Sequence, residues 1–199
     1  TVAVQLDYSR DRATFDDCQN GEVDFEVPYE ITEYVAGFVG STNGLVISYD
    51  GVVTGFEPSE VALADGTLKE FDGTIVVPMY EGKDNQDGKT HTAVKVTSFK
   101  GPVHDDTGAV IEAGAFDSVK DTLETLVLPI YITEIPDNAF KDFKNLKTVI
   151  AYGVTSIGEN AFAGCTSLEK FYVDTAITHM GNNAFEGVGE VVVAAYDSA

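Results

Sequence analysis

A short pattern of apolar and polar residues recurs four times in the second half of the chain. Each copy has one apolar residue, three variable residues and then an alanine–phenylalanine pair. The copies span 111–116, 135–140, 157–162 and 180–185. Their phenylalanines are 24, 22 and 23 residues apart. A nearly fixed period of this size is typical of proteins built from stacked repeats, in which each repeat is one supersecondary unit.

Further apolar positions follow each copy at matching distances. Three residues after the first three phenylalanines come Val119, Phe143 and Cys165, which we expect to point inward. Each unit then carries a pattern of the form L-x-x-L-x-L. This pattern predicts strands over 123–128, 146–151, 168–173 and, with a shorter connection, 188–193. Leucine-rich repeats have this pattern and a period of about 20–29 residues, and consecutive copies must stack because one unit cannot bury its apolar face alone.

The clearest unit runs from Val154 to Phe171 and reads V-T-S-I-G-E-N-A-F-A-G-C-T-S-L-E-K-F. It closely resembles the BspA-like (Treponema-type) leucine-rich repeat, and the resemblance extends from about Gly108 to Val193. A weaker resemblance to the first part of such a repeat region covers 74–99, and insertions at 84–93 and 100–108 interrupt the pattern. The resemblance implies a β-rich fold with short helices or 3-10 turns, arranged as a right-handed solenoid with an N-terminal β-rich cap.

The first 72 residues contain no copy of the phrase. β-forming residues on both sides of Asp50-Gly51 predict a hairpin over 44–56. A short helical turn is expected over 58–66, and 25–34 alternates like an edge strand.

We therefore interpret 1–72 as a β-rich cap or flanking region and 73–199 as the repeat region, with clear units from about 108. Terminal units of a solenoid need such a cap. The chain begins without methionine, and we expect it to be a segment of a longer protein.

The charge balance excludes several classes of partner. There are 12 basic and 33 acidic residues, so the formal net charge is −21. A surface of this charge repels phosphate polyanions and anionic lipids, so nucleic-acid binding is not expected. The longest apolar run, Val191 to Tyr196, is far shorter than the ~20 residues that a membrane-spanning helix needs.

No motif predicts catalysis or a phosphate-binding loop. Ser41 stands one position too early within Gly40–Gly44 to form the G-x-S-x-G elbow. Chance pairs of carboxylates are common among 33 acidic residues, so a glycosidase site is not expected. Cys165 falls in the inward-facing column, where cysteine acts as a small apolar residue. Cys18 is either a free loop thiol or is paired with a cysteine elsewhere.

No metal site or cofactor is predicted. His91, His104 and His179 do not have the spacing of zinc ligands. The segments Asp84–Gly88 and Asp105-Asp106 offer clustered oxygen atoms, but they lack the ligand pattern of an EF-hand. We interpret both as solvated turns rather than calcium sites.

The pleat of each strand sends alternate residues to a face that we expect to be open to solvent. The candidate ligand-binding residues on this face are Thr125, Val127, Thr148, Ile150, Tyr152, Lys170, Tyr172 and Asp174. Val127, Ile150, Tyr172 and Val192 form a ladder of apolar and aromatic side chains. Exposed apolar surface commonly marks an interaction site, although cross-strand pairs of this kind also stabilise a sheet by ~0.2–1 kcal/mol each.

The family resemblance implies a bacterial protein that is secreted or attached to the cell surface. It also implies a non-enzymatic adhesion module that binds protein, matrix or glycan partners on host or neighbouring cells. The alternative is an accessory or spacer domain of a larger extracellular enzyme whose catalytic part lies elsewhere.

Overall fold

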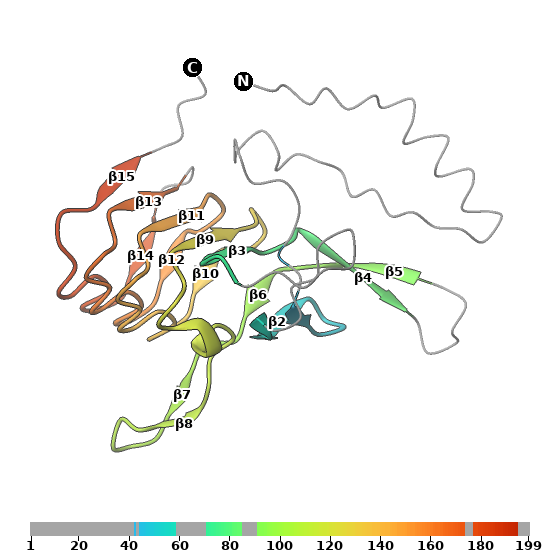
Figure 1. The fold of residues 1–199 in the computed structure, drawn as a ribbon, viewed down its shortest axis with the longest axis horizontal. Helices are drawn as coiled ribbons and strands as arrows, with labels where there is room; N and C mark the ends of the chain where they lie inside the picture. The colour runs from blue at the N-terminus through green and yellow to red at the C-terminus, as the bar shows by residue number, and fades with distance from the viewer. Residues whose placement is uncertain (1–41, 43, 59–70, 85–90, 174–176, 195–199) are drawn as a thin grey trace.

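The computed structural model describes residues 42, 44–58, 71–84, 91–173 and 177–194, and in these ranges the fold is almost entirely β (Figure 1). The element η3 (Asp117–Val119) is a single 3-10 turn, and no α-helix occurs in the described ranges. This confirms the β-rich class with short 3-10 turns. The same ranges contain no helix of the length and apolar character needed to cross a membrane.

A five-stranded parallel sheet forms one side of the repeat stack. Its strands, in spatial order, are β15 (Val192–Ala194), β13 (Lys170–Tyr172), β11 (Thr148–Ala151), β9 (Thr125–Leu128) and β3 (Thr74–Val76). Leu126 pairs with Val149, and Val149 pairs with Phe171. All three are buried, as predicted. The strands start later than the L-x-x-L-x-L pattern predicted, because its first leucines (Leu123, Leu146 and Leu168) are buried in the irregular segments between the turns and the strands.

A second set of short parallel strands lies on the other side of the stack. It comprises β10 (Glu134–Ile135), β12 (Ser156–Ile157) and β14 (His179–Met180), and also β2 (Val52–Phe56) with β6 (Ser98–Phe99). The same bond recurs in both groups, since the Lys100 N–H donates to the Val53 carbonyl and the Gly158 N–H donates to the Ile135 carbonyl, each at 2.8 Å. Between β6 and β10, the position of the donor is taken by Pro136, which has no N–H to donate. The ladder is therefore interrupted at this proline.

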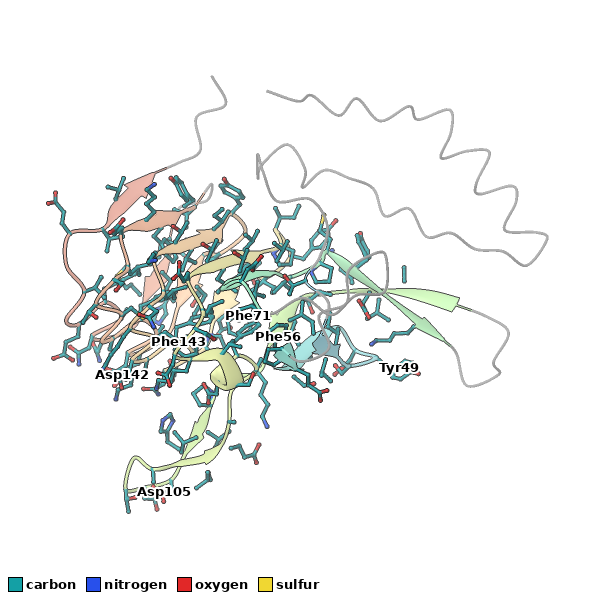
Figure 2. All side chains as sticks on the ribbon, viewed as in Figure 1. Tyr49, Phe56, Phe71, Asp105, Asp142 and Phe143 are labelled. Atoms are coloured by element: carbon teal, nitrogen blue, oxygen red, sulfur yellow. The ribbon has the colours of Figure 1, made fainter. Side chains whose placement is uncertain are left out.

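A column of stacked phenylalanine rings explains why the alanine–phenylalanine pair recurs. Phe116, Phe140, Phe162 and Phe185 follow one another with ring centroids 5.8, 5.4 and 5.2 Å apart and interplanar angles of 19°, 13° and 14°. Phe143 packs edge-on against Phe140. It lies within the stack, whereas the preceding residue, Asp142, is exposed (Figure 2). Such ring pairs contribute beyond simple burial of area.

Asparagine fixes the turn that leads into three of the four phenylalanines. Asn138, Asn160 and Asn183 have φ angles of 55°, 53° and 55°. Asparagine tolerates this left-handed region better than other non-glycine residues do. The turn allows the Phe140 and Phe162 N–H groups to donate to the carbonyls of the next unit, at 2.8 and 2.7 Å.

The first unit of the stack is interrupted by two hairpins. The first pairs β4 (Tyr80–Asp84) with β5 (His91–Lys95), and the second pairs β7 (Val103–His104) with β8 (Val110–Glu112). Both insertions fall at or near the two interruptions expected from the sequence. The second hairpin projects away from the stack (Figure 1).

The phrase over 111–116 is not a true copy of the repeat, which corrects the prediction from the sequence. Ile111 lies on the second hairpin and is 61% exposed, whereas Ile135 and Ile157 are fully buried. Phe99 occupies the place that the pattern gave to Ile111. Its ring lies 5.4 Å from that of Phe116, and β6 pairs with β2 as described above.

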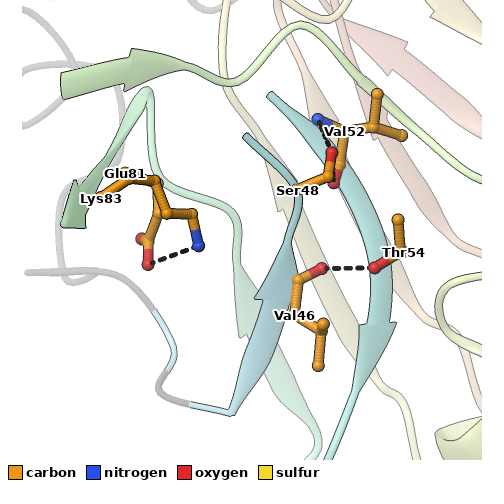
Figure 3. A network of polar contacts seen from close by, with 6 residues as sticks. All are labelled: Val46, Ser48, Val52, Thr54, Glu81 and Lys83. Atoms are coloured by element: carbon orange, nitrogen blue, oxygen red, sulfur yellow. Dashed lines mark hydrogen bonds and ion pairs between the residues drawn. The ribbon is translucent and has the colours of Figure 1, made fainter. Parts of the chain in front are cut away.

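The predicted hairpin around Asp50-Gly51 is confirmed. It consists of β1 (Leu45–Ile47) and β2, which are antiparallel, and Gly51 has a φ angle of 81°. In Figure 3, the Thr54 hydroxyl donates to the Val46 carbonyl and the Val52 N–H donates to the Ser48 hydroxyl, each at 3.1 Å. Because β2 also pairs with β6, this hairpin extends the stack at its N-terminal end. The strand predicted over 25–34 and most of the turn over 58–66 lie outside the described residues, so the boundary at residue 72 stays a prediction.

Candidate interaction surface

The register of the five-stranded sheet brings part of the predicted surface into one line. Thr125 pairs with Thr148, Thr148 with Lys170 and Lys170 with Val192. The threonines are half-buried, Lys170 is exposed, and Val192 is 59% exposed. Exposure along this line therefore increases toward β15.

In the neighbouring line on the same face, Val127 and Ile150 are buried and Tyr172 is partly buried, contrary to the expectation of an open ladder. Val127, Ile150 and Tyr152 are 2%, 7% and 4% exposed and form an apolar cluster separate from the main core. Val76, Ile130 and Tyr172 pack against this cluster and are partly buried. These side chains are shielded from solvent because β-branched and aromatic side chains in adjacent strands cover one another and Ile130 packs against them.

The accessible part of the predicted surface is thus a smaller group, which we call the edge patch. It consists of Thr125, Thr148, Lys170, Tyr172 and Val192. It offers hydroxyl groups, a cation, part of an aromatic ring and an exposed apolar side chain. Among the described strands, β15 has a neighbour on one side only, so the patch borders a sheet edge (Figure 1). Asp174, which was also predicted to lie on this face, falls outside the described residues.

An aromatic contact near this sheet was not found from the sequence. The hydroxyl groups of Tyr80 and Tyr131 are 3.2 Å apart, and the Lys95 ammonium group lies over the Tyr131 ring, 3.6 Å from its centroid. Together they anchor the β4–β5 hairpin to the turn after β9. A signal was present, because 74–80 and 125–131 share the pattern T-x-V-x-P-x-Y. The first three residues of these two segments pair in β3 and β9.

Cys165 is a buried thiol, as the repeat alignment predicted. Its Sγ donates to the Phe140 carbonyl at 2.9 Å. Burial raises the pKa of this thiol to about 12. The thiol therefore stays protonated at neutral pH, and thiolate chemistry is disfavoured. Cys18 lies outside the described residues.

The candidate turn at Asp105-Asp106 lies on the surface, whereas residues 85–88 of the other acidic segment lie outside the described residues. The Asp105 carboxylate accepts hydrogen bonds from the Thr107 hydroxyl and N–H and from the Ala109 N–H, at 2.6, 2.8 and 2.9 Å. The bond from the Thr107 hydroxyl is the main reason that the pKa of Asp105 is lowered. This geometry confirms the predicted turn. No group of three or more potential metal ligands occurs in the part of the chain that the structure describes.

The comparison with protein families supports the resemblance. Residues 97–192 match the model described as BspA type leucine rich repeat region, in six copies. The match begins just before Phe99, in agreement with the corrected register of the first unit. Neither the curated proteins nor the solved structures compared with the chain gave a match.

Proposed function

Because residues 97–192 belong to the BspA-type leucine-rich repeat family, we propose that this chain is a non-enzymatic protein-interaction module of a secreted or surface-attached bacterial protein. The observation that carries the proposal is the edge patch. It combines an exposed cation, a partly exposed tyrosine and an exposed valine beside a sheet edge that has one neighbouring strand in the described part of the chain. Tyrosine and apolar side chains are favoured at protein interfaces.

The proposal includes the shape of the scaffold. The chain passes alternately from the five-stranded sheet to the short strands on the other side, in the order β9, β10, β11, β12, β13, β14 and β15. Parallel strands joined by crossovers of this kind are right-handed in nearly all proteins. We therefore infer a right-handed solenoid, in which the repeat core holds the edge patch on a rigid surface.

The partner in this proposal is a protein, matrix component or glycan on a host or neighbouring cell. The net charge of −21 repels polyanions over most of the surface. Lys170 gives the edge patch a local positive charge. We therefore expect the preferred ligand to present an acidic or neutral polar group close to an apolar one.

The test compares two double variants that make the same chemical changes at different places. Lys170→Glu with Tyr172→Ser alters the edge patch, whereas Lys144→Glu with Tyr49→Ser alters exposed residues elsewhere. Each is measured by surface plasmon resonance against a panel of purified extracellular-matrix proteins and glycans, and thermal unfolding verifies the fold. We expect at least about tenfold weaker binding for the first variant only. Equal binding by both variants would contradict the role of the edge patch.

A spacer or accessory domain of a larger extracellular enzyme is the second candidate. The burial of Val127, Ile150 and Tyr152 favours it, because it removes most of the apolar ladder from contact with ligands. If the unaltered chain binds no member of the panel, the spacer role is supported and the interaction proposal fails.

A further inference from the structure

The β7–β8 hairpin is an insertion that the repeat fold does not need. Fifteen residues separate Phe99 from Ala115, whereas three separate Ile135 from Ala139 in the regular unit. The Ala115 N–H donates to the Lys100 carbonyl at 2.8 Å, so the two ends of the insertion meet at its base. In repeat proteins, insertions of this kind are found in loops, often on the binding face.

The hairpin is paired along its strands but leaves apolar side chains in solvent. Val103, Val110 and Ile111 are 41%, 56% and 61% exposed. Because a two-stranded hairpin is marginal by itself in water, its local bonds matter. Lys100 and Glu112 form an ion pair at 2.7 Å, and Asp105 caps the turn as described above.

The charge of the hairpin limits what can dock on it. Lys100 is paired with Glu112, which leaves the Asp105 and Asp106 carboxylates as the excess charge beside the apolar side chains. The Asp105 bonds lie within its own turn, so this carboxylate keeps its negative charge. A second copy of this chain, with a net charge of −21, is repelled from such a surface.

The hairpin also has backbone available for pairing. Among the described strands, β8 has a neighbour on one side only, and all three of its residues are exposed. An extended peptide can add to such an edge, with main-chain bonds giving affinity and side chains giving specificity.

We propose that the β7–β8 hairpin is a second docking element, which binds an extended cationic segment of another protein along β8. Lysine or arginine side chains of that segment face Asp105 and Asp106, and its apolar side chains pack against Val110 and Ile111. This element is separate from the edge patch (Figure 1), so either proposal can fail without the other.

The probe is a short labelled peptide that alternates lysine and valine, and its control alternates glutamate and valine. Binding to the full chain is measured by fluorescence anisotropy at low and high salt. The hairpin variant is Val110→Thr with Ile111→Thr. The matched control, Val46→Thr with Met180→Thr, changes exposed apolar residues on β1 and β14, outside both the hairpin and the edge patch. In a third variant, Asp-Asn replaces residues 101–114, which restores the short connection of the regular units.

We expect the lysine–valine peptide to bind the unaltered chain, and we expect its affinity to fall as the salt concentration rises. The hairpin variant should bind at least about tenfold more weakly, and the variant without the hairpin should not bind, whereas the matched control should be unchanged. Thermal unfolding verifies that each variant is folded. Binding that persists without the hairpin, no binding to the unaltered chain, or equal binding of the glutamate–valine peptide would overturn the proposal. Hairpin-dependent binding to phosphatidylcholine vesicles in place of the peptide would also overturn it.

Discussion

The regular units and the first unit of the stack are built on the same core but differ in their connections. In the regular units, three residues link the buried isoleucine to the alanine–phenylalanine pair. In the first unit, a whole hairpin occupies this position. The phenylalanine column nevertheless continues from Phe116 to Phe140 with a ring spacing of 5.8 Å. Stacking therefore depends on the buried columns and not on the length of the loops between them.

The largest effect should come from breaking the shared column. Phe162 is fully buried and stacks between Phe140 and Phe185. Replacing it with alanine should lower the free energy of unfolding by about 3–5 kcal/mol, because the substitution removes buried area and leaves a cavity. Urea unfolding followed by circular dichroism measures this loss. A loss below about 1 kcal/mol would show that the column does not support the stack.

A smaller effect should come from the turn that sets up the column. Asn160 has a φ angle of 53°, so alanine at this position should cost roughly 1–2 kcal/mol. Glycine, which adopts this conformation freely, is the matched control and should cost less than alanine. If the two variants unfold at the same urea concentration, the left-handed turn is not the cause of the asparagine preference.

The buried thiol should make the regular stack sensitive to alkali. The pKa of Cys165 is raised from 9.0 to about 12, so between these values the unfolded chain loses the thiol proton and the folded chain retains it. The thiol therefore contributes a loss of stability of roughly 1 kcal/mol per pH unit in this window, and none below it. The unfolding free energy of Cys165→Ala should fall less steeply with pH than that of the unaltered chain. Parallel pH profiles would contradict the assigned burial.

The smallest effect should come from the surface of the regular units. Lys147 and Glu124 pair at 2.7 Å, but each side chain is about half exposed. An exposed pair contributes ~0–1 kcal/mol and is screened by salt. Lys147→Ala should therefore change the unfolding free energy by less than about 1 kcal/mol. A larger loss that persists at high salt would show a structural role beyond the ion pair.

Periodicity predicted the regular part of this fold because each buried column needs the same residue type at the same position. Leu126, Val149 and Phe171 were placed correctly for this reason. In the first unit the pattern gave a wrong prediction. Ile111 matches the repeat pattern but lies in an exposed hairpin, whereas Phe99, twelve residues earlier in the chain, fills the buried column. The candidate surface was only partly predictable. The pleat gives the face of each residue, but it does not show that Ile130 and Tyr172 pack against Val127 and Ile150.

The most direct test of this account compares the same substitution at the two positions that the sequence makes equivalent. Ile135→Ala should lower the free energy of unfolding by about 2–5 kcal/mol, because Ile135 is fully buried. Ile111→Ala should change it by less than about 0.5 kcal/mol, because Ile111 lies in solvent on the hairpin. Urea unfolding of the two variants side by side gives the answer. Equal losses would contradict the assignment of the hairpin as an insertion outside the stack.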